Sequence, residues 1–249
     1  MYGRVPKVAN SSIKSSLCKL LSTKPIGGTK TTADRFWVQD TNGETKLITT
    51  LQARHLRATH FSFSFVRNPF DRIVAAYNNK ILEIEDVPVP MRQMGLYHSM
   101  PFGEFIQVVC KVESTLLDNH VRPQAEILTT DNKIVPKFIG RLEHIDNHWR
   151  QLRRRMKFEG LPTLGFLPRK NVRRDNRRDI ANYFKTTKLI DLILERYSVD
   201  FEKFYEPYDV DQLVSGEDLL QHPPLQRGLA KAKQQFNSLS TTKAESHNV

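Results

Sequence analysis

The stretch FSFSFVRNPFDRIVAAYNNK, residues 61–80, decides the fold class of this chain. Phenylalanine and serine alternate through residues 61–65, a pattern that predicts a strand with one apolar face. Asn68 can cap a helix N-terminus, and Pro69 fits the first helical turn. Apolar residues then recur at helical spacing. The stretch therefore predicts a strand, a tight turn that carries Arg67, and a buried helix.

A second example of this arrangement is predicted at the start of the chain. Residues 1–5 can form a short strand, and the segment VPKVANSSIK at 5–14 follows it. Apolar spacing predicts a helix over 12–21, with serines available as N-cap residues. Two interpretations stay open here. The serines cap an ordinary helix, or the free N–H groups of the first turn hold a phosphate or sulfate together with Lys7 and Lys14.

Predicted strands and helices alternate along the rest of the chain. The further elements are a helix over 101–112, a strand over 137–143, a helix over 144–156 and a last helix over 180–197. This alternation predicts an α/β fold with a parallel sheet. The turns that follow parallel strands lie at the carboxyl edge of such a sheet, where ligands bind.

Three segments lack these patterns. Residues 22–52 are polar and contain GG and NG pairs, which predicts turns or a hairpin. The proline-rich VPVP at 87–90 predicts a surface loop. The last part of the chain is polar and weakly patterned. We therefore expect one domain over 1–209 and a flexible tail over 210–249.

The net charge of +11 is concentrated in one part of the 249-residue chain. Residues 150–178 contain eleven Lys and Arg against two acidic residues. Such a patch suggests a polyanionic partner: nucleic acid, an acidic or sulfated glycan, or a multiply charged cofactor. An ordinary solvated helix face is the alternative for RQLRRRMK at 150–157. Few aromatic residues are interleaved with this charge, which disfavours nucleic acid.

Composition also restricts the class of protein and its location. No apolar run approaches the roughly 18 residues that cross a bilayer, and the N-terminus lacks the order of a secretory signal. Cys18 and Cys110 lie in apolar helical patterns, and neither they nor the histidines show metal-ligand spacing. We therefore expect a cytoplasmic protein. The alternative is a Golgi-type lumenal domain whose membrane anchor has been removed.

Several motifs resemble those of the sulfotransferases that use 3′-phosphoadenosine 5′-phosphosulfate (PAPS). VPKVANSSIK is similar to their 5′-phosphosulfate loop. FVRNPFDRIVAAYNNK resembles their 3′-phosphate motif, in the form of the carbohydrate O-sulfotransferase branch that includes chondroitin and dermatan enzymes and bacterial relatives. Three shorter matches follow in the same order: Asp118, His120, Pro123 and Gln124; Phe138, Ile139, Gly140, Arg141 and Glu143; Tyr197, Asp200 and Phe204. The similarity extends from Pro6 to Tyr208.

This resemblance implies a three-layer, P-loop-like α/β sulfotransferase fold with a central parallel sheet. It implies PAPS as the sulfuryl donor and no metal. The 5′-phosphosulfate would lie on the loop at residues 7–12, called the first loop below. The 3′-phosphate would lie on Arg67, whose planar fork suits phosphate. The residues implied for donor binding are Lys7, Val8, Ala9, Asn10, Ser11, Ser12, Lys14, Arg67, Arg173 and Arg174.

The resemblance also implies the chemistry, an in-line transfer of a sulfuryl group to a carbohydrate hydroxyl. Lys7 would stabilise the bridging oxygen as negative charge develops on it. A hydroxyl is a poor nucleophile, so a base should remove its proton, and His120 beside Asp118 is our candidate. Alternatives for this base are Glu143, His55 and His60. The residues assigned to the acceptor are Arg122, Gln124 and Glu143.

Two positions depart from the family pattern. Ala75 stands where the family commonly has a serine that joins the motif arginine on the 3′-phosphate, and Val121 replaces an aromatic residue. A second class of function therefore stays open: a non-catalytic protein that binds a polyanion, glycan or nucleic acid, on a degenerate sulfotransferase fold. A nucleotide-dependent phosphotransferase is disfavoured, because the chain has no G-x-x-x-x-G-K-[ST] loop.

Overall fold

A central, mostly parallel sheet organises the protein. The computed structural model describes residues 1–168, 177–216 and 223–227. Its sheet has four strands in the order β1-β2-β5-β6. These strands are β1 (Tyr2–Gly3), β2 (Phe63–Val66), β5 (Phe138–Arg141) and β6 (Leu225–Gln226). The pairs β1–β2 and β2–β5 are parallel, whereas β6 runs antiparallel to β5 at the edge. A separate antiparallel pair joins β3 (Thr129–Thr130) to β4 (Lys133–Ile134).

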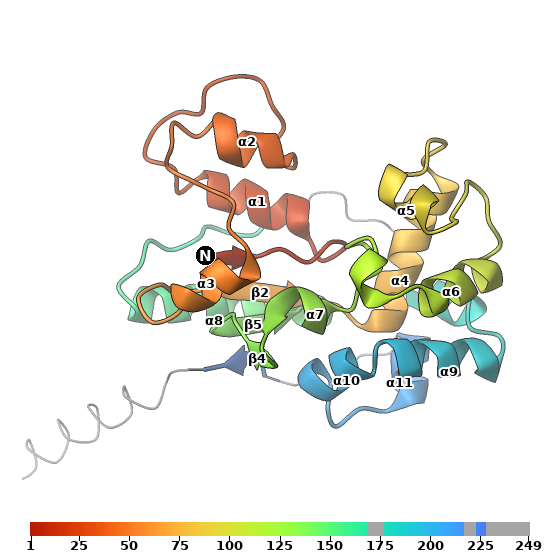
Figure 1. The fold of residues 1–249 in the computed structure, drawn as a ribbon. Helices are drawn as coiled ribbons and strands as arrows, with labels where there is room; N and C mark the ends of the chain where they lie inside the picture. The colour runs from red at the N-terminus through yellow and green to blue at the C-terminus, as the bar shows by residue number, and fades with distance from the viewer. Residues whose placement is uncertain (169–176, 217–222, 228–249) are drawn as a thin grey trace, which may run out of the picture.

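Helices surround this sheet. In the described residues the α-helices are α1 (Asn10–Cys18), α2 (Asp34–Gln39), α3 (Thr50–His55), α4 (Pro69–Tyr77), α5 (Val89–Gln93), α6 (Phe102–Lys111), α7 (Gln124–Leu128), α8 (Ile145–Phe158), α9 (Thr187–Arg196), α10 (Ser198–Phe204) and α11 (Val210–Ser215). Figure 1 shows α1 and α2 above the sheet and α9, α10 and α11 below it. A mixed α/β fold with a mostly parallel sheet is thus confirmed. The sheet departs from the expected parallel arrangement only at its edge, where β6 is antiparallel.

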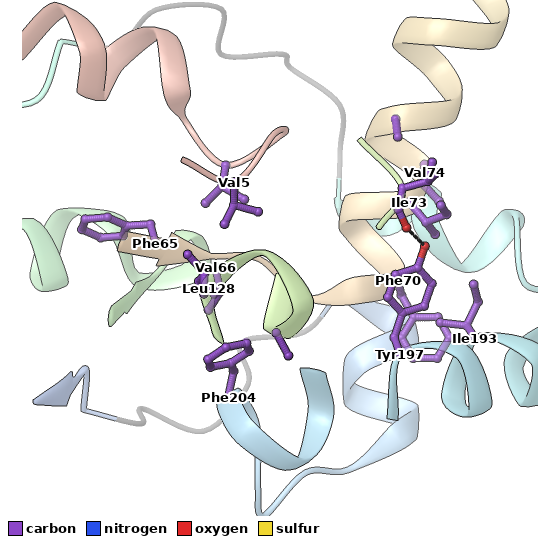
Figure 2. Close-up of a cluster of buried hydrophobic side chains, with 14 of the residues drawn as sticks. Val5, Phe65, Val66, Phe70, Ile73, Val74, Leu128, Ile193, Tyr197 and Phe204 are labelled. Carbon is purple, nitrogen blue, oxygen red and sulfur yellow. Dashed lines mark hydrogen bonds between the residues drawn. The ribbon is translucent and has the colours of Figure 1, made fainter. Parts of the chain in front are cut away.

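The decisive stretch forms the elements that its pattern predicts. All four residues of β2 are buried, and Asn68 caps α4 by accepting a hydrogen bond from the Phe70 N–H at 3.1 Å. Phe70, Ile73 and Val74 of α4 then join a core cluster that includes Tyr197 (Figure 2). The fold therefore depends on burial of β2 and of one stripe of α4.

The glycine of the FIGR strand permits a close approach between neighbouring strands. Gly140 of β5 pairs with Phe65 of β2, and a Cβ added at Gly140 would lie 2.3 Å from the Phe65 ring. Phe65 is itself fixed between Phe138 and Trp149, with ring centroids 6.2 Å and 5.9 Å away. The ring therefore has little room to yield.

We expect Gly140→Ala to lower the free energy of unfolding by about 2 kcal/mol, because overpacking a rigid core costs about 1–3 kcal/mol. Thermal or urea unfolding measures this change. Gly103→Ala is the matched control, since Gly103 lies in α6 and a Cβ there meets open space. Alanine is also the better helix former, so this control should keep or raise stability. Equal effects of the two substitutions would contradict the packing argument.

Three local predictions need correction. Residues 22–52 contain turns, as one of the two expectations had it, but also α2 and the start of α3, and they form no hairpin. The sequence contains a signal for α3, because Thr49 and Gln52 form a capping box. VPVP is not a plain surface loop, since Val87 is buried and α5 begins at Val89. The last predicted helix is divided: a 3-10 helix covers Arg177–Asn182, and α9 begins only at Thr187.

The predicted boundary at residue 209 also needs correction. Beyond it, α11 packs on the domain through the buried Leu213, whose carbonyl accepts a hydrogen bond from Asn68 Nδ2 at 2.7 Å. Strand β6 adds an edge to the sheet. Short polar segments of this kind acquire their structure from tertiary contacts that their own pattern does not reveal. None of the helices in the described ranges combines the length and apolar character needed to cross a bilayer.

Candidate active site

Two loops meet at the carboxyl edge of the sheet. Strands β1 and β2 are parallel neighbours, with Tyr2 opposite Phe63, so the loop after β1 and the turn after β2 lie side by side. A hydrogen bond joins them directly, because Arg67 Nη1 donates to the Lys7 carbonyl at 3.2 Å. The prediction that both turns lie at the carboxyl edge of the sheet is therefore confirmed, and the structure adds that they are neighbours. One contains Lys7 and the other Arg67.

The first loop has an unusual backbone that brings the chain into α1. Lys7 and Ala9 have φ angles of 67° and 48°, in the left-handed region that non-glycine residues rarely adopt. Val5 and Val8 are fully buried and anchor the loop on the core. The helix begins at Asn10, two residues before the predicted start, and its N-cap is Ala9. Ala9 supplies no capping side chain.

The first turn of α1 is positioned mainly by Asn10. Its Nδ2 donates to the Val5 carbonyl at 2.8 Å, and its Oδ1 accepts from the Tyr2 hydroxyl. Ser11 is half-buried and Ser12 is buried in this first turn, so neither is the N-cap. The first turn contains no acidic residue. The positive end of the helix dipole therefore stays available for an anion.

Lys14 does not have the surroundings predicted for it. The residue is only 6% exposed, and its ammonium donates to the Thr32 carbonyl at 2.9 Å and to Asp34 Oδ1 at 3.1 Å. Asp34 also binds Arg4. Because a carboxylate and a carbonyl already hold this ammonium, the prediction that Lys14 contacts the donor is withdrawn. Its contacts connect α1 to the segment before α2.

Arg67 is held at several points and keeps one part of its side chain available. Its Nε donates to Asp71 Oδ2 at 2.7 Å, one turn on in α4. Its Nη1 reaches the first loop, as described above. Within the described residues its Nη2 makes no hydrogen bond, and the side chain is 21% exposed. Arg67 can therefore offer Nη2 to an anionic ligand while its other nitrogens fix the guanidinium.

Gln124 has a different role from the predicted one. It is fully buried, and its side-chain amide binds both backbone groups of Arg67, accepting from the N–H at 2.8 Å and donating to the carbonyl at 2.7 Å. Asp200, also fully buried, accepts from the Gln124 N–H at 2.9 Å and from Nε2 at 3.2 Å. The prediction that Gln124 binds substrate is therefore wrong. It is a clamp that positions Arg67, and Asp200 orients the clamp.

The other two residues assigned to the acceptor are likewise engaged with the protein. Glu143 Oε1 accepts a hydrogen bond from the Asn68 N–H at 2.5 Å. Burial raises the pKa of Glu143, and this hydrogen bond opposes the rise. The guanidinium of Arg122 donates to the carbonyls of Thr115 and Leu117 at 3.1 Å and 2.9 Å. Both side chains stabilise loops at the site, and these contacts give no support to a direct contact with the acceptor.

His120 has the geometry of a general base. Its Nδ1 lies 2.7 Å from Asp118 Oδ1, which also accepts from the His120 backbone N–H at 2.8 Å. A carboxylate accepts hydrogen bonds only, so Nδ1 carries the hydrogen and Nε2 keeps a lone pair. The side chain is partly exposed, at 30%. Asp118 therefore fixes the tautomer in which Nε2 can take a proton.

The electrostatic surroundings favour the neutral form of this imidazole. Burial lowers the pKa of His120, and the positive charges of Lys80 and Lys7 lower it further, whereas the hydrogen bond and charge of Asp118 act in the opposite direction. The surroundings thus favour a neutral imidazole, the form that can accept a proton.

Sequence reasoning missed Arg72, which connects α4 to the first loop and to the loop that carries His120. This residue of α4 is 1% exposed. Its Nε donates to the Pro6 carbonyl at 3.1 Å, and its Nη1 and Nη2 donate to the carbonyls of Arg122 and Asn119 at 2.8 Å each. In the chain, Pro6 directly precedes Lys7, and Asn119 and Arg122 lie on either side of His120. Its own helix gives no signal for this role, because Arg72 lies away from the apolar stripe of Phe70, Ile73 and Val74 and its partners are carbonyls of other segments.

Some predicted residues cannot be placed. Arg173 and Arg174, predicted to close over the donor, lie outside the described residues. Ala75 lies on α4 and is half-buried. Over the described ranges, no group of three or more His, Cys, Asp or Glu is arranged to hold a metal ion.

Comparison with known proteins identifies the family. A model described as the sulfotransferase family matches residues 1–207. No curated protein and no solved structure matches the chain. The matched range contains the first loop, the Arg67 turn and the His120 loop, and it covers most of the chain. This chain therefore belongs to the sulfotransferase family, whose members transfer sulfuryl groups.

Proposed function

We propose that this protein is an O-sulfotransferase that uses PAPS as donor and a carbohydrate hydroxyl as acceptor. The observation that carries the proposal is the direct contact between the two anion-binding turns, in which Arg67 Nη1 binds the Lys7 carbonyl at 3.2 Å. Their juxtaposition suits a donor with two separated anionic groups. His120, with Asp118 behind it, supplies a base for the acceptor.

The residues present fit such a donor. The helix dipole of α1 and the ammonium of Lys7 favour a phosphosulfate at the first loop. The Nη2 of Arg67 is available for a 3′-phosphate, and the clamp by Gln124 fixes the backbone from which it extends. Arg173 and Arg174 remain our proposed closing contacts.

The chain's own groups then have separate tasks. PAPS supplies the sulfuryl group, which passes to the acceptor oxygen as the bond from sulfur to the bridging oxygen breaks. Lys7 stabilises the negative charge on the departing phosphate, an interaction that is strongest in the transition state. His120 Nε2 takes the proton of the acceptor hydroxyl, and Asp118 stabilises the resulting imidazolium.

The acceptor is proposed from the motif around His120, which resembles that of the chondroitin and dermatan branch. Exposed basic residues on α8 agree with an acidic glycan, because a positive surface raises the local concentration of a polyanion. These residues are Arg150, Arg154 and Lys157. The proposal is tested by incubating the protein with radiolabelled PAPS and a panel of unsulfated glycans, including chondroitin. Transfer of label to a glycan, with release of the bisphosphate, is expected.

A non-catalytic binder of polyanions is the second candidate. It is favoured by the basic face of α8, where Arg153 also lies over the Phe166 ring at 5.0 Å. Such a protein would bind glycans in a salt-dependent way but transfer no label to any of them. Binding without turnover across the panel would therefore replace our first proposal with this one.

The departure at Ala75 yields a prediction. We expect Ala75→Ser to tighten binding of 3′-phosphoadenosine 5′-phosphate (PAP) by about three- to tenfold, because it restores a hydroxyl that the family commonly places on the 3′-phosphate. Isothermal titration calorimetry measures the change in Kd. Ala76→Ser is the matched control: Ala76 is fully buried, so its hydroxyl should lower stability without tightening binding. An unchanged Kd in Ala75→Ser would mean that position 75 does not face the phosphate.

A further inference from the structure

A π-helix follows α4 in the chain and contacts the first loop through one side chain. Asn78–Leu82 follows α4 directly, and a π-turn of this kind is rare and frequent at functional sites. It presents Asn79 to the loop after β1, where Asn79 Oδ1 accepts a hydrogen bond from the ammonium of Lys7. Lys7 and Asn79 are 72 positions apart in the chain. Their contact is therefore made by the fold.

The Asn79 side chain is oriented from its other end. Its Nδ2 donates to Glu83 Oε2 at 3.0 Å, which leaves the oxygen of the amide for Lys7. The Glu83 N–H donates to the Asn78 carbonyl at 3.1 Å and closes the turn. The π-helix thus orients the amide that faces Lys7.

The π-helix is itself attached to the core. Asn78 Oδ1 accepts from the Tyr183 hydroxyl at 2.9 Å, and the Tyr183 ring packs edge-on against Phe102 with centroids 4.9 Å apart. A side chain with such support can hold a flexible lysine in one place. Fixing a lysine before the ligand arrives reduces the entropy lost on binding.

We propose that Asn79 is a positioning residue that holds the ammonium of Lys7 toward the 5′-end of the donor. This inference rests on the proposed function, in which Lys7 faces the 5′-phosphosulfate. An amide suits the task because it accepts a hydrogen bond without carrying a negative charge. A carboxylate at the same position would cancel the charge of Lys7 and repel the donor.

The test compares two probes by calorimetry: PAP, which carries a 5′-phosphate, and 3′-AMP, which lacks it. We expect Asn79→Ala to weaken PAP binding about tenfold and to change the Kd of 3′-AMP less than about twofold, since only PAP reaches Lys7. Asn79→Asp should weaken PAP further than Asn79→Ala. In a Lys7→Gly background, Asn79→Ala should have no additional effect on PAP binding.

The controls separate the possible failures. Asn147→Ala on α8 removes a comparable exposed asparagine and should leave both Kd values unchanged. If Lys7→Gly weakens PAP but not 3′-AMP, and Asn79→Ala affects neither or both equally, the role of Asn79 is refuted while the proposed function stands. If wild-type protein does not bind PAP, or Lys7→Gly does not discriminate between the probes, the proposed function fails and this inference with it.

Discussion

Removal of the Lys7 side chain is expected to lower kcat by about 10²–10³-fold, the usual cost of losing one group that stabilises developing charge. Lys7 adopts a φ of 67°, so Lys7→Gly is preferred to Lys7→Ala because glycine accepts this backbone without strain. The measurement is the rate of label transfer from PAPS to the acceptor found in the glycan screen. KM for the acceptor should change much less than kcat, because the lost interaction is strongest in the transition state.

A matched control keeps this prediction specific. Lys46 is exposed, and Lys46→Gly removes the same charge from the protein. It should leave kcat unchanged within about twofold. A kcat for Lys7→Gly within about threefold of wild type, in a variant with unaltered thermal stability, would exclude Lys7 as the group that stabilises the leaving phosphate.

Replacement of His120 by alanine is expected to lower kcat at pH 7 by about 10²–10⁴-fold, the range for loss of a general base. In wild type the base must be unprotonated, so the rate should rise with pH through the His120 pKa. Burial lowers that pKa, and Lys80 and Lys7 add to the effect, so the midpoint should lie below the ordinary value of about 6.5. His120→Ala should lose this acid limb.

Asp118 makes the pH dependence a sharper test. Its hydrogen bond and charge raise the pKa of His120, so Asp118→Asn should move the acid limb to lower pH. The same change should reduce kcat, because the asparagine no longer stabilises the imidazolium. His98→Ala, an exposed histidine, is the control and should change neither rate nor profile. An acid limb that persists unchanged in His120→Ala would assign the base to another residue.

Local patterns were sufficient for the elements that carry the site. The strand at Phe63–Val66 and the helix that begins at Pro69 were predicted because alternation, an N-cap and an N1 proline act within a few residues. The turns at Lys7 and Arg67 were placed at one edge of the sheet because each follows a strand that was predicted to be parallel. Gly140 belonged to a recognised motif, but its physical reason, the Phe65 ring, became visible only when β2 and β5 were paired.

Side-chain partners distant in sequence could not be predicted in this way. Gln124 matched a family motif and was assigned to substrate, yet it clamps Arg67 57 positions away. Lys14 was assigned to the donor from its place one helical turn beyond the first loop. Nothing in its own helix reveals that its partner is Asp34. Arg72 and Asn79 were overlooked for the same reason: their roles depend on carbonyls and an ammonium that other segments supply.

The central claim is that the first loop and the Arg67 turn form one site for a nucleotide with phosphates on both its 3′ and 5′ positions. A thermal shift assay tests it most directly, because a ligand that binds only the folded state raises the midpoint of unfolding. We predict a clear rise in Tm with PAP, little or none with ATP or AMP at the same concentration, and loss of the rise in Arg67→Ala. Equal shifts with all three nucleotides, or none with PAP at millimolar concentration, would contradict the claim.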